Sequence, residues 1–521
     1  MVSSQVHGDL LPDNYISVFQ QLKRNASRAP TSPALVSLEI DDSITWKELL
    51  DWCSFVSQFL QELEIKANDK VLVLGENSIE NLILYYGIQA FGATYCTINT
   101  DINKNHIIEM IDRIKPELIL FDQGLETLPI EEIKNTRRFS FGDRKSCTGL
   151  FAKLSCFDHN TFYYLKNNQT DNCVLCFTSG TSAQPKGVIH SFCNYQAIAQ
   201  HQLERWSLKR KDRILEFRSM SWASAHMISL NPTLLAGATL LLGKKFSRSH
   251  LVSWIEKYKP SIIVSVPTVV NMLLERPIEN GKKTFESVRF ISCSTAPLMA
   301  DAHRRFENTY DAELVQLYGM SEGGIIAANT PGKREIGSVG TPGKYQDISI
   351  RDSNRKLLGT GEIGEIETLS AQHAKAYLYA DGNLELLRGK PLKTGDLGYI
   401  DGKGFLRITG RAKDVVIRGG VNISPLEIDS LISQLPGVMQ VVTFGVPDPV
   451  YGEELVSWVV SAPGHRLTIQ DLKGFCAEKL PEQKRPKYIQ LVQDIPKNKR
   501  GKIDREKAKL DWQTSQKKGN A

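Results

Sequence analysis

Residues 70–75, Lys-Val-Leu-Val-Leu-Gly, decide how the first half of the chain is expected to fold. An apolar run that ends in glycine is typical of a buried strand followed by a turn. Residues 78–90 then place apolar side chains at helical spacing, and residues 96–98 form a second short strand-like run. Strand, helix and strand in this order predict a βαβ unit, in which the two strands lie parallel in one sheet.

The same alternation continues along the chain. Further strand-like runs occur at residues 118–120, 238–242, 262–266 and 290–293. The predicted fold class is therefore α/β, with a large N-terminal domain of parallel-sheet βαβ layers covered by helices. After about residue 335, short strands separated by glycine-rich turns indicate a β-rich subdomain.

A small α+β domain is predicted at the C-terminal end. Strand-like runs at 415–417, 438–446 and 455–461 alternate with helical patterns at 425–434 and 469–479. We expect the N-terminal domain to span residues 1–411 and the C-terminal domain to span residues 412–521.

Composition and charge exclude some classes of function. The net charge is +6, from 64 basic and 58 acidic residues, and this excess is too small in 521 residues to indicate a nucleic-acid-binding surface. The nine cysteines are odd in number and follow no disulfide spacing, which favours reduced thiols and a cytoplasmic protein. Cys173 and Cys176 form a CxxC pair, interpreted either as thiols packed in a strand or as a metal or redox pair.

No targeting or membrane segment is expected. Residues 1–14 lack the basic start and the apolar core of a signal peptide. The longest apolar stretch, residues 230–242, is broken by Asn231, Pro232 and Gly237 and is shorter than the ~18 apolar residues that a spanning helix needs.

The segment that follows residue 177 is rich in phosphate-binding residue types. Four hydroxyl residues, two glycines and a lysine crowd one turn between apolar runs: Thr178, Ser179, Gly180, Thr181, Ser182, Lys186 and Gly187. Glycine lets the backbone approach an anion, hydroxyl groups donate to phosphate oxygens, and lysine adds a positive charge. The segment is no Walker A loop, because Pro185 and Gly187 stand where that motif has glycine and Ser or Thr. Taken alone, it could also be a surface turn.

Three more segments carry polar groups suited to a nucleotide. Residues 316–322 combine an aromatic ring, a hydroxyl and a carboxylate, and residues 294–298 read Ser-Thr-Ala-Pro-Leu. Asp396 lies in a Thr-Gly-Asp turn about 15 residues before Arg411. Each of these segments alone is compatible with ordinary turn chemistry, so their order and spacing carry the argument.

In that order and spacing, the segments resemble the motifs of the acyl-adenylate-forming superfamily. This superfamily contains acyl- and aryl-CoA synthetases, the adenylation domains of peptide synthetases, and luciferases. Together with residues 44–49 and 92–94, the similarity covers nearly the whole chain. Ala183, Ser294 and Thr295 depart from the pattern, because each stands where the superfamily usually has glycine.

The resemblance implies a role for each motif residue. The hydroxyl-rich turn and Lys186 would bind phosphates, Ser321 would bind a further phosphate oxygen, and Glu322 would hold Mg²⁺. Asp396 and Arg411 would bind the ribose. Tyr318 would stack on adenine, and the segments around it would complete the nucleotide site: Ser294, Thr295, Ala296, Pro297, Gln316, Gly319 and Met320.

The longest match, residues 410–428, implies a rotating C-terminal domain with Lys413 as its hinge. Gly419 and Gly420 would line the tunnel for the thiol arm of coenzyme A, although a hairpin is a compatible interpretation. Lys502, within residues 496–505, would enter the active site for adenylation. A lysine there reduces the repulsion between an attacking carboxylate and the α-phosphate, whereas the alternative is a solvated basic tail.

Residues 219–226, Ser-Met-Ser-Trp-Ala-Ser-Ala-His, fall where relatives carry a gating histidine. Trp222 aligns with that histidine, and Trp222 and His226 are the candidate substrate residues. Core packing of Trp222 is the alternative. No acidic residue lies between residues 219 and 230, which argues against an amino acid as substrate. The bulk of Trp222, with Ala, Ser and Met around it in the sequence, favours a small or medium acyl or aryl acid over a long chain.

The sequence therefore predicts an ATP-dependent acid–thiol ligase with ATP, Mg²⁺ and coenzyme A as cofactors, acting in fatty acid metabolism. The alternative acceptor is the phosphopantetheine thiol of a carrier protein. A binding protein without catalysis and an oxidative luciferase are the other classes considered. The retention of Lys186, Glu322, Asp396, Arg411 and Lys502 argues against the binding protein, and nothing in the sequence favours the luciferase.

Overall fold

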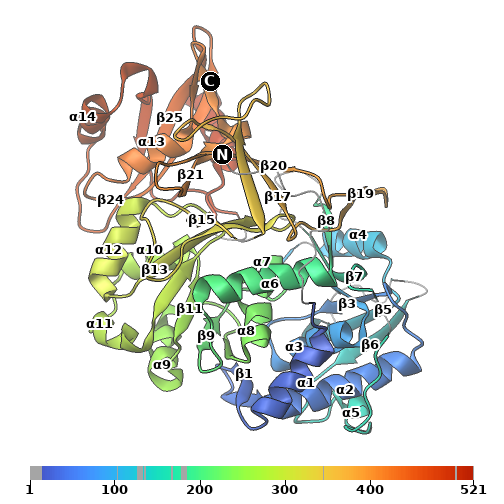
Figure 1. Cartoon of the computed structure of the whole chain (residues 1–521). Helices are drawn as coiled ribbons and strands as arrows, with labels where there is room; N and C mark the ends of the chain where they lie inside the picture. Colours follow the sequence, from blue (N-terminus) through green and yellow to red (C-terminus); the bar gives the residue numbers. More distant parts are fainter. Residues whose placement is uncertain are drawn as a thin grey trace.

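The computed structural model describes residues 15–102, 104–125, 133, 136–165, 168–177, 185–343, 345–498 and 502–519. Two large sheets with their helices and a small antiparallel sheet precede a C-terminal unit that has its own sheet and its own core. Figure 1 shows this unit, orange to red, at the top of the molecule. The predicted α/β class with a large N-terminal and a small C-terminal domain is confirmed.

The first large sheet is parallel at its centre and antiparallel at its edges. Its nine strands are, in order, β15 (Thr341–Pro342), β14 (Gly324–Ala328), β13 (Leu314–Met320), β12 (Phe290–Cys293), β11 (Ile262–Ser265), β9 (Arg213–Glu216), β10 (Thr239–Leu242), β1 (Pro33–Ser37) and β2 (Asp42–Thr45). The runs predicted at 238–242, 262–266 and 290–293 are thus confirmed as strands.

The second large sheet contains the βαβ unit that was predicted from residues 70–98. Its eight strands are, in order, β19 (Leu384–Leu386), β18 (Ala376–Leu378), β8 (Gly187–Ser191), β7 (Asn172–Phe177), β4 (Thr94–Thr97), β3 (Lys70–Leu74), β5 (Leu118–Asp122) and β6 (Arg137–Phe141). Helix α3 (Ile79–Phe91) joins β3 to β4, which lie parallel. The Ser78 side chain caps its first turn, and Gly92 ends it with a left-handed φ of 106°.

Helices cover both sheets. Their bounds are α1 (Val18–Arg28), α2 (Trp46–Glu62), α4 (Lys104–Ile114), α5 (Leu150–Leu154), α6 (Phe192–Trp206), α7 (Ala223–Ala225), α8 (Asn231–Ala236), α9 (Arg248–Tyr258), α10 (Pro267–Glu275), α11 (Gly281–Thr284) and α12 (Ala300–Tyr310). Helix α6 lies between the sheets and contacts β14 of one and β7 and β8 of the other (Figure 1). It therefore forms part of the core that joins the two layers.

The predicted β-rich subdomain is an antiparallel sheet of four strands. They are β16 (Gln346–Arg351), β17 (Gly364–Ser370), β20 (Leu392–Ile400) and β21 (Leu406–Arg411). The register of β20 and β21 places Asp396 opposite Arg411. Cross-strand neighbours on one face lie within contact distance, so this register brings two predicted ribose-binding residues together.

The C-terminal unit follows directly. It consists of β22 (Val416–Arg418), β23 (Val421–Ile423), α13 (Pro425–Ile432), β24 (Val438–Asp448), β25 (Gly452–Ser461), α14 (Ile469–Lys479), β26 (Tyr488–Leu491) and α15 (Arg505–Gly519). Helix α14 has the predicted bounds. The sequence analysis missed α15, whose Ala508 and Trp512 are buried in a cluster with side chains of β24 and β25.

The cysteine pair Cys173 and Cys176 lies buried in β7, and both residues are free thiols. Within the described ranges, no group of three or more His, Cys, Asp or Glu side chains could hold a metal ion. No helix in that same part of the chain is both long and apolar enough to cross a membrane.

Candidate active site

The hydroxyl-rich turn joins two neighbouring antiparallel strands. Thr178, Ser179, Gly180, Thr181 and Ser182, as well as Ala183, lie outside the described residues. The strands on either side are described, and their last pair is Phe177 opposite Gly187. The described ends of β7 and β8 thus face each other, and Lys186 directly precedes β8.

Two tyrosines hold Lys186. Its Nζ lies 4.6 Å from the ring centre of Tyr377 and 4.9 Å from that of Tyr379, and it donates to the Tyr379 hydroxyl at 3.4 Å. Tyr377 lies on β18, opposite Val188 of β8. Such cation–π contacts fix a flexible cation while leaving it charged. The sequence analysis missed both tyrosines, because only the pairing of strands 190 residues apart brings them to the lysine.

Tyr377 also joins Lys186 to the predicted metal ligand. Its hydroxyl donates to Glu322 Oε1 at 3.0 Å. Burial raises the pKa of the Glu322 carboxyl, and the hydrogen bond from Tyr377 and the charge of Lys186 oppose that rise. Lys186 and Glu322, predicted from motifs far apart in sequence, thus belong to one cluster.

His190 fixes the turn that carries Glu322. Its Nε2 donates to the carbonyl oxygen of Ser321 at 2.8 Å, and its Nδ1 accepts from Asn194 Nδ2 at 3.0 Å. Burial lowers the His190 pKa to about 4, so the ring is neutral at pH 7 with its proton on Nε2. The sequence analysis assigned no role to this histidine, since it stands in an apolar strand without a motif of its own.

A second polar cluster joins strand β13 to the paired strands β20 and β21. The Tyr318 hydroxyl donates to Asp396 Oδ2 at 2.6 Å, and Arg411 Nε lies 3.1 Å from Asp396 Oδ1. Burial and the Asp396 carboxylate raise the pKa of Tyr318, which keeps its proton. The structure thus brings together the predicted adenine and ribose residues.

The shape of the β13–β14 hairpin differs from a strand-to-helix turn. Strand β13 continues to Met320, turns through Ser321 and Glu322, and returns as the antiparallel β14. A Cβ at Gly319 would lie 2.3 Å from the carbonyl oxygen of Gly324, so only glycine fits there. The tight hairpin carries Tyr318 on strand β13 and Glu322 in the turn that follows it.

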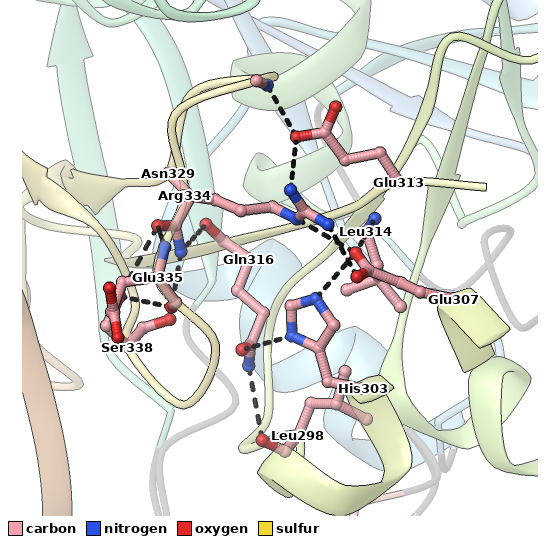
Figure 2. A network of polar contacts seen from close by, with 11 residues as sticks. Leu298, His303, Glu307, Glu313, Leu314, Gln316, Asn329, Arg334, Glu335 and Ser338 are labelled. Atoms are coloured by element: carbon pink, nitrogen blue, oxygen red, sulfur yellow. Dashed lines mark hydrogen bonds and ion pairs between the residues drawn. The ribbon is translucent and has the colours of Figure 1, made fainter. Parts of the chain in front are cut away.

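Gln316 occupies a buried network behind this strand (Figure 2). Its Nε2 donates to the carbonyl of Leu298 at 3.4 Å, and its Oε1 lies 3.4 Å from His303 Nδ1. His303 Nε2 in turn lies 3.1 Å from Glu307, which Arg334 also contacts at 2.6 Å. Burial alone would raise the pKa of Glu307, but the contacts from His303 and Arg334 lower this pKa to about 2.

Gln316 therefore connects β13 to the end of the 294–298 loop. Its side chain, 5% exposed, braces the loop from within the core. Pro297 and Gly319 are exposed, whereas Ala296, Met320 and Ser321 are partly buried at this edge of the sheet. Nucleotide contacts by these residues remain predictions.

The 294–298 loop carries backbone strain where the sequence departs from glycine. Thr295 has a φ of 73°, in the left-handed region that β-branched residues rarely adopt. Ser294 is 2% exposed, and its hydroxyl finds no hydrogen-bond partner among the described residues. The loop thus keeps a glycine-type backbone with larger side chains.

Replacing Thr295 by glycine should relieve this strain. We expect Thr295→Gly to be more stable than Thr295→Ala by about 1 kcal/mol, because alanine keeps the Cβ that makes a left-handed φ costly. Chemical unfolding of both variants measures the difference. An alanine variant that is as stable as the glycine variant would contradict the assignment.

The candidate substrate residues lie at two depths. Trp222 is partly buried at the start of α7. His226 is fully buried in a π-helical turn, where its Nε2 donates to the Met220 carbonyl at 2.6 Å and its Nδ1 accepts from the Tyr195 hydroxyl at 2.9 Å. Burial lowers the His226 pKa to about 4. His226 thus supports residues 219–226, which we call the acyl stretch, through its contact with Met220. The role of Trp222 remains a prediction.

A buried ion pair lies beneath this stretch. Arg218 binds Glu216 through Nε and Nη2, and Nη2 also donates to the Ser224 carbonyl at 3.3 Å. Arg218 Nη1 and the Ser292 hydroxyl find no hydrogen-bond partner among the described residues. The sequence analysis missed Arg218, which follows an apolar strand and matches no motif.

The remaining predicted residues lie at the start and end of the C-terminal unit. Lys413 is exposed in the turn Ala412–Asp414. Gly419 and Gly420, with φ of 56° and 82°, form the two-residue turn between β22 and β23. Lys502 donates its N–H to Asn498 Oδ1 at 3.1 Å, and its carbonyl accepts from the Asn498 N–H at 2.8 Å.

Comparison with known families covers most of the chain. Residues 22–378 match the family model "AMP-binding enzyme", and residues 427–502 match "AMP-binding enzyme C-terminal domain". The fold is also that of a solved structure, ATP-bound MatB from Rhodopseudomonas palustris. The TM-score is 0.85 at 24% identity, over 95% of this chain and 99% of that one.

Curated relatives are CoA ligases. The sulfoacetate–CoA ligase of Cupriavidus necator is 32% identical over 339 residues, which are 64% of this chain and 65% of that protein. The oxalate–CoA ligase of Arabidopsis thaliana is 27% identical over 86% of this chain and 89% of that protein. These matches confirm the predicted reaction class, in which an acid is activated as acyl-AMP and joined to coenzyme A. The chain belongs to the AMP-binding enzyme family, among its acid–CoA ligases.

Proposed function

We propose that this protein ligates a small carboxylic acid, which carries a second polar group, to coenzyme A. The observation that carries the proposal is the β13–β14 hairpin. Tyr318 on this hairpin contacts Asp396 and Arg411, and Glu322 on its turn joins the cluster of Lys186 and Tyr377. One short hairpin thus carries a group suited to a nucleoside on its first strand and a group suited to a phosphate-bound cation in its turn.

The proposed first step is attack of the acid's carboxylate on the α-phosphate of ATP, with pyrophosphate leaving. Lys186, held by its two tyrosines, stabilises the negative charge on the phosphates. Asp396 accepts from the ribose hydroxyls, and Arg411 holds Asp396 in place. Lys502 brings positive charge between the carboxylate and the α-phosphate, which otherwise repel each other.

The site suits Mg²⁺ through Glu322. A magnesium ion bound to phosphates needs only one or two protein carboxylates, so the lack of a larger acidic group in the described residues is compatible with it. Glu322 would hold the ion, which would neutralise phosphate charge. A cation beside this carboxyl would also favour its ionised form, which burial disfavours.

In the second step, the thiol of coenzyme A attacks the carbonyl of the acyl-adenylate and AMP leaves. We propose that the domain boundary lies at residues 411 and 412. Rotation about Lys413 would withdraw Lys502 and bring Gly419 and Gly420 to the thiol. The exposed position of Lys413 in a short turn suits a hinge, because few contacts resist a change in its dihedral angles.

The acyl stretch supports a small polar acid. Arg218 offers a buried N–H that finds no acceptor among the described residues, and Ser292 and Ser294 offer hydroxyls. The register of β9, β11 and β12 places Leu215 level with Ile291, and Glu216 and Ser292 are the next residues on their strands. The two curated relatives described above act on sulfoacetate and oxalate, which are small acids with a second anionic group.

Pyrophosphate release with a panel of acids, with and without coenzyme A, tests the proposed function. The panel contains sulfoacetate, oxalate, ferulate and a medium-chain fatty acid. We expect a small polar acid to give the highest kcat/KM and free acyl-CoA as product. Release of pyrophosphate without acyl-CoA, followed by loading of a carrier protein, would identify the alternative acceptor. No acid-dependent exchange with any acid would overturn the proposal.

Glu322→Gln should lower the kcat of adenylation by about 100-fold, because an amide would hold Mg²⁺ less well and the phosphates would lose charge stabilisation of this order. The measurement is acid-dependent ATP–pyrophosphate exchange. Glu385→Gln is the matched control, because Glu385 accepts from Tyr379 in the same cluster but is exposed. Equal losses in the two variants would contradict the role of Glu322.

A further inference from the structure

The guanidinium of Arg505 joins four segments of the C-terminal unit. Arg505 is the first residue of α15, and its Nε donates to the Thr443 carbonyl of β24 at 2.7 Å. Its Nη2 lies 2.5 Å from Asp429 of α13, and its Nη1 lies 3.4 Å from Asp414 of the hinge turn. A planar guanidinium can hold several acceptors at fixed angles, which an ammonium cannot.

Two of these acceptors are well shielded from water. The Asp429 side chain is 2% exposed and that of Asp414 is 14% exposed, whereas Arg505 itself is 22% exposed. Burial raises the pKa of Asp429 to about 6 although Arg505 lies beside it. Contacts of this kind are stronger and more directional than exposed ion pairs.

Arg505 and its partner Asp414 both lie close in the sequence to lysines with proposed roles. Lys502 stands three residues before Arg505, and Lys413 stands immediately before Asp414. The loop that carries Lys502 is closed by backbone pairs, among them Asp504 N–H to the Pro496 carbonyl at 2.8 Å. The loop therefore ends on α15 at the residue that is tied to the hinge turn.

We propose that Arg505 is a positioning residue that fixes the Lys502 loop to the hinge turn, so that rotation about Lys413 carries Lys502 as part of one rigid body. The inference rests on the proposed roles of Lys413 and Lys502. Loosening the anchor lets Lys502 sample positions away from the α-phosphate. Adenylation depends on that position, whereas acyl transfer to coenzyme A takes place with Lys502 withdrawn.

The test compares the two half-reactions in Arg505→Lys and Asp414→Asn. Asp414→Asn removes the charge at the hinge and leaves the buried Arg505–Asp429 pair intact. Arg505→Lys keeps a charge for Asp429 but loses the fixed geometry. We expect both variants to lower the kcat of ATP–pyrophosphate exchange about tenfold or more, since a displacement of about 1 Å can cost as much as 100-fold. The KM for ATP and the rate of acyl transfer from supplied acyl-AMP should both stay within about twofold of the wild-type values, a change much smaller than the expected loss in kcat.

Lys507→Gln is the matched control, because Lys507 is an exposed cation on the same helix and pairs only with Asp511 among the acidic residues described. Thermal unfolding verifies the fold of each variant, and if Arg505→Lys does not fold, Asp414→Asn decides alone. Unchanged exchange in a folded Asp414→Asn, or equal loss of both half-reactions, would overturn the inference. A wild-type protein that shows no exchange with any acid would instead refute the proposed function.

Discussion

Replacing Lys502 by alanine is expected to reduce acid-dependent ATP–pyrophosphate exchange by 100-fold or more. The carboxylate and the α-phosphate are both negative, and a charged donor between them acts mainly in the transition state, where removal of one such group costs about 3–4 kcal/mol. The KM for ATP should change little, because the nucleotide contacts proposed for Lys186, Glu322 and Asp396 do not depend on Lys502. The loss should therefore appear in kcat.

Transfer of the acyl group from supplied acyl-AMP to coenzyme A separates this role from a structural one. The Lys502→Ala protein should perform this step at a rate within about threefold of the wild type, a change of less than 1 kcal/mol. Lys497→Ala is the control, since Lys497 lies in the same loop and pairs with Asp494. If both half-reactions fell equally in Lys502→Ala, domain rotation about Lys413 would be the wrong account.

The sequence predicted the parallel core because that core depends on local signals. The apolar run of β3, the Ser78 cap and Gly92 together define one βαβ unit. The capping contacts of Ser78 and Gly92 are with residues only three or four positions away in the sequence, so a local pattern is enough to identify them. Helix α15 was missed for the opposite reason. Most of its residues are charged or polar, and among its described side chains only Ala508 and Trp512 are buried against β24 and β25, so the sequence shows little apolar periodicity.

The residues of the candidate site likewise fall into those that local motifs identify and those that only tertiary contacts bring to the site. Residues in motifs were found because their type and spacing are distinctive, and the register of a hairpin explains why Asp396 meets Arg411. Tyr377, His190 and Arg218 were not found. Tyr377 contacts Lys186 through the pairing of β8 with β18, and His190 contacts the Ser321 carbonyl, which is 131 residues away in the sequence. No local pattern reports such contacts.

Four buried histidines should make the protein sensitive to acid. Burial lowers the pKa of His190, His226 and His373 to about 4 and that of His201 to about 3. In the unfolded chain each titrates near the ordinary value of about 6.5. Between these values the unfolded state binds more protons than the folded one, so stability rises with pH and is lost as the pH falls from about 6.5 towards 4.

The expected effect is large. Each pKa unit corresponds to about 1.4 kcal/mol, so each of these histidines can remove roughly 3 kcal/mol of stability on full protonation of the unfolded state. Asp429 acts in the opposite direction, because burial raises its pKa to about 6 and the folded state then binds the additional proton. One such carboxyl offsets only part of the loss. The free energy of unfolding should therefore drop by several kcal/mol between pH 7.5 and pH 5.

Denaturant unfolding at several pH values between 7.5 and 5 measures this slope directly, and variants identify its source. His373→Gln should flatten the dependence by up to one proton, since His373 is buried and its titration is removed. His465→Gln should leave the slope unchanged, because His465 is exposed. An unfolding free energy that is the same at pH 7.5 and pH 5 would mean that the buried rings gain protons within the folded protein. In that case His190 Nδ1 would carry a proton at pH 5 and could not accept from Asn194 Nδ2, although its Nε2 would still donate to the Ser321 carbonyl.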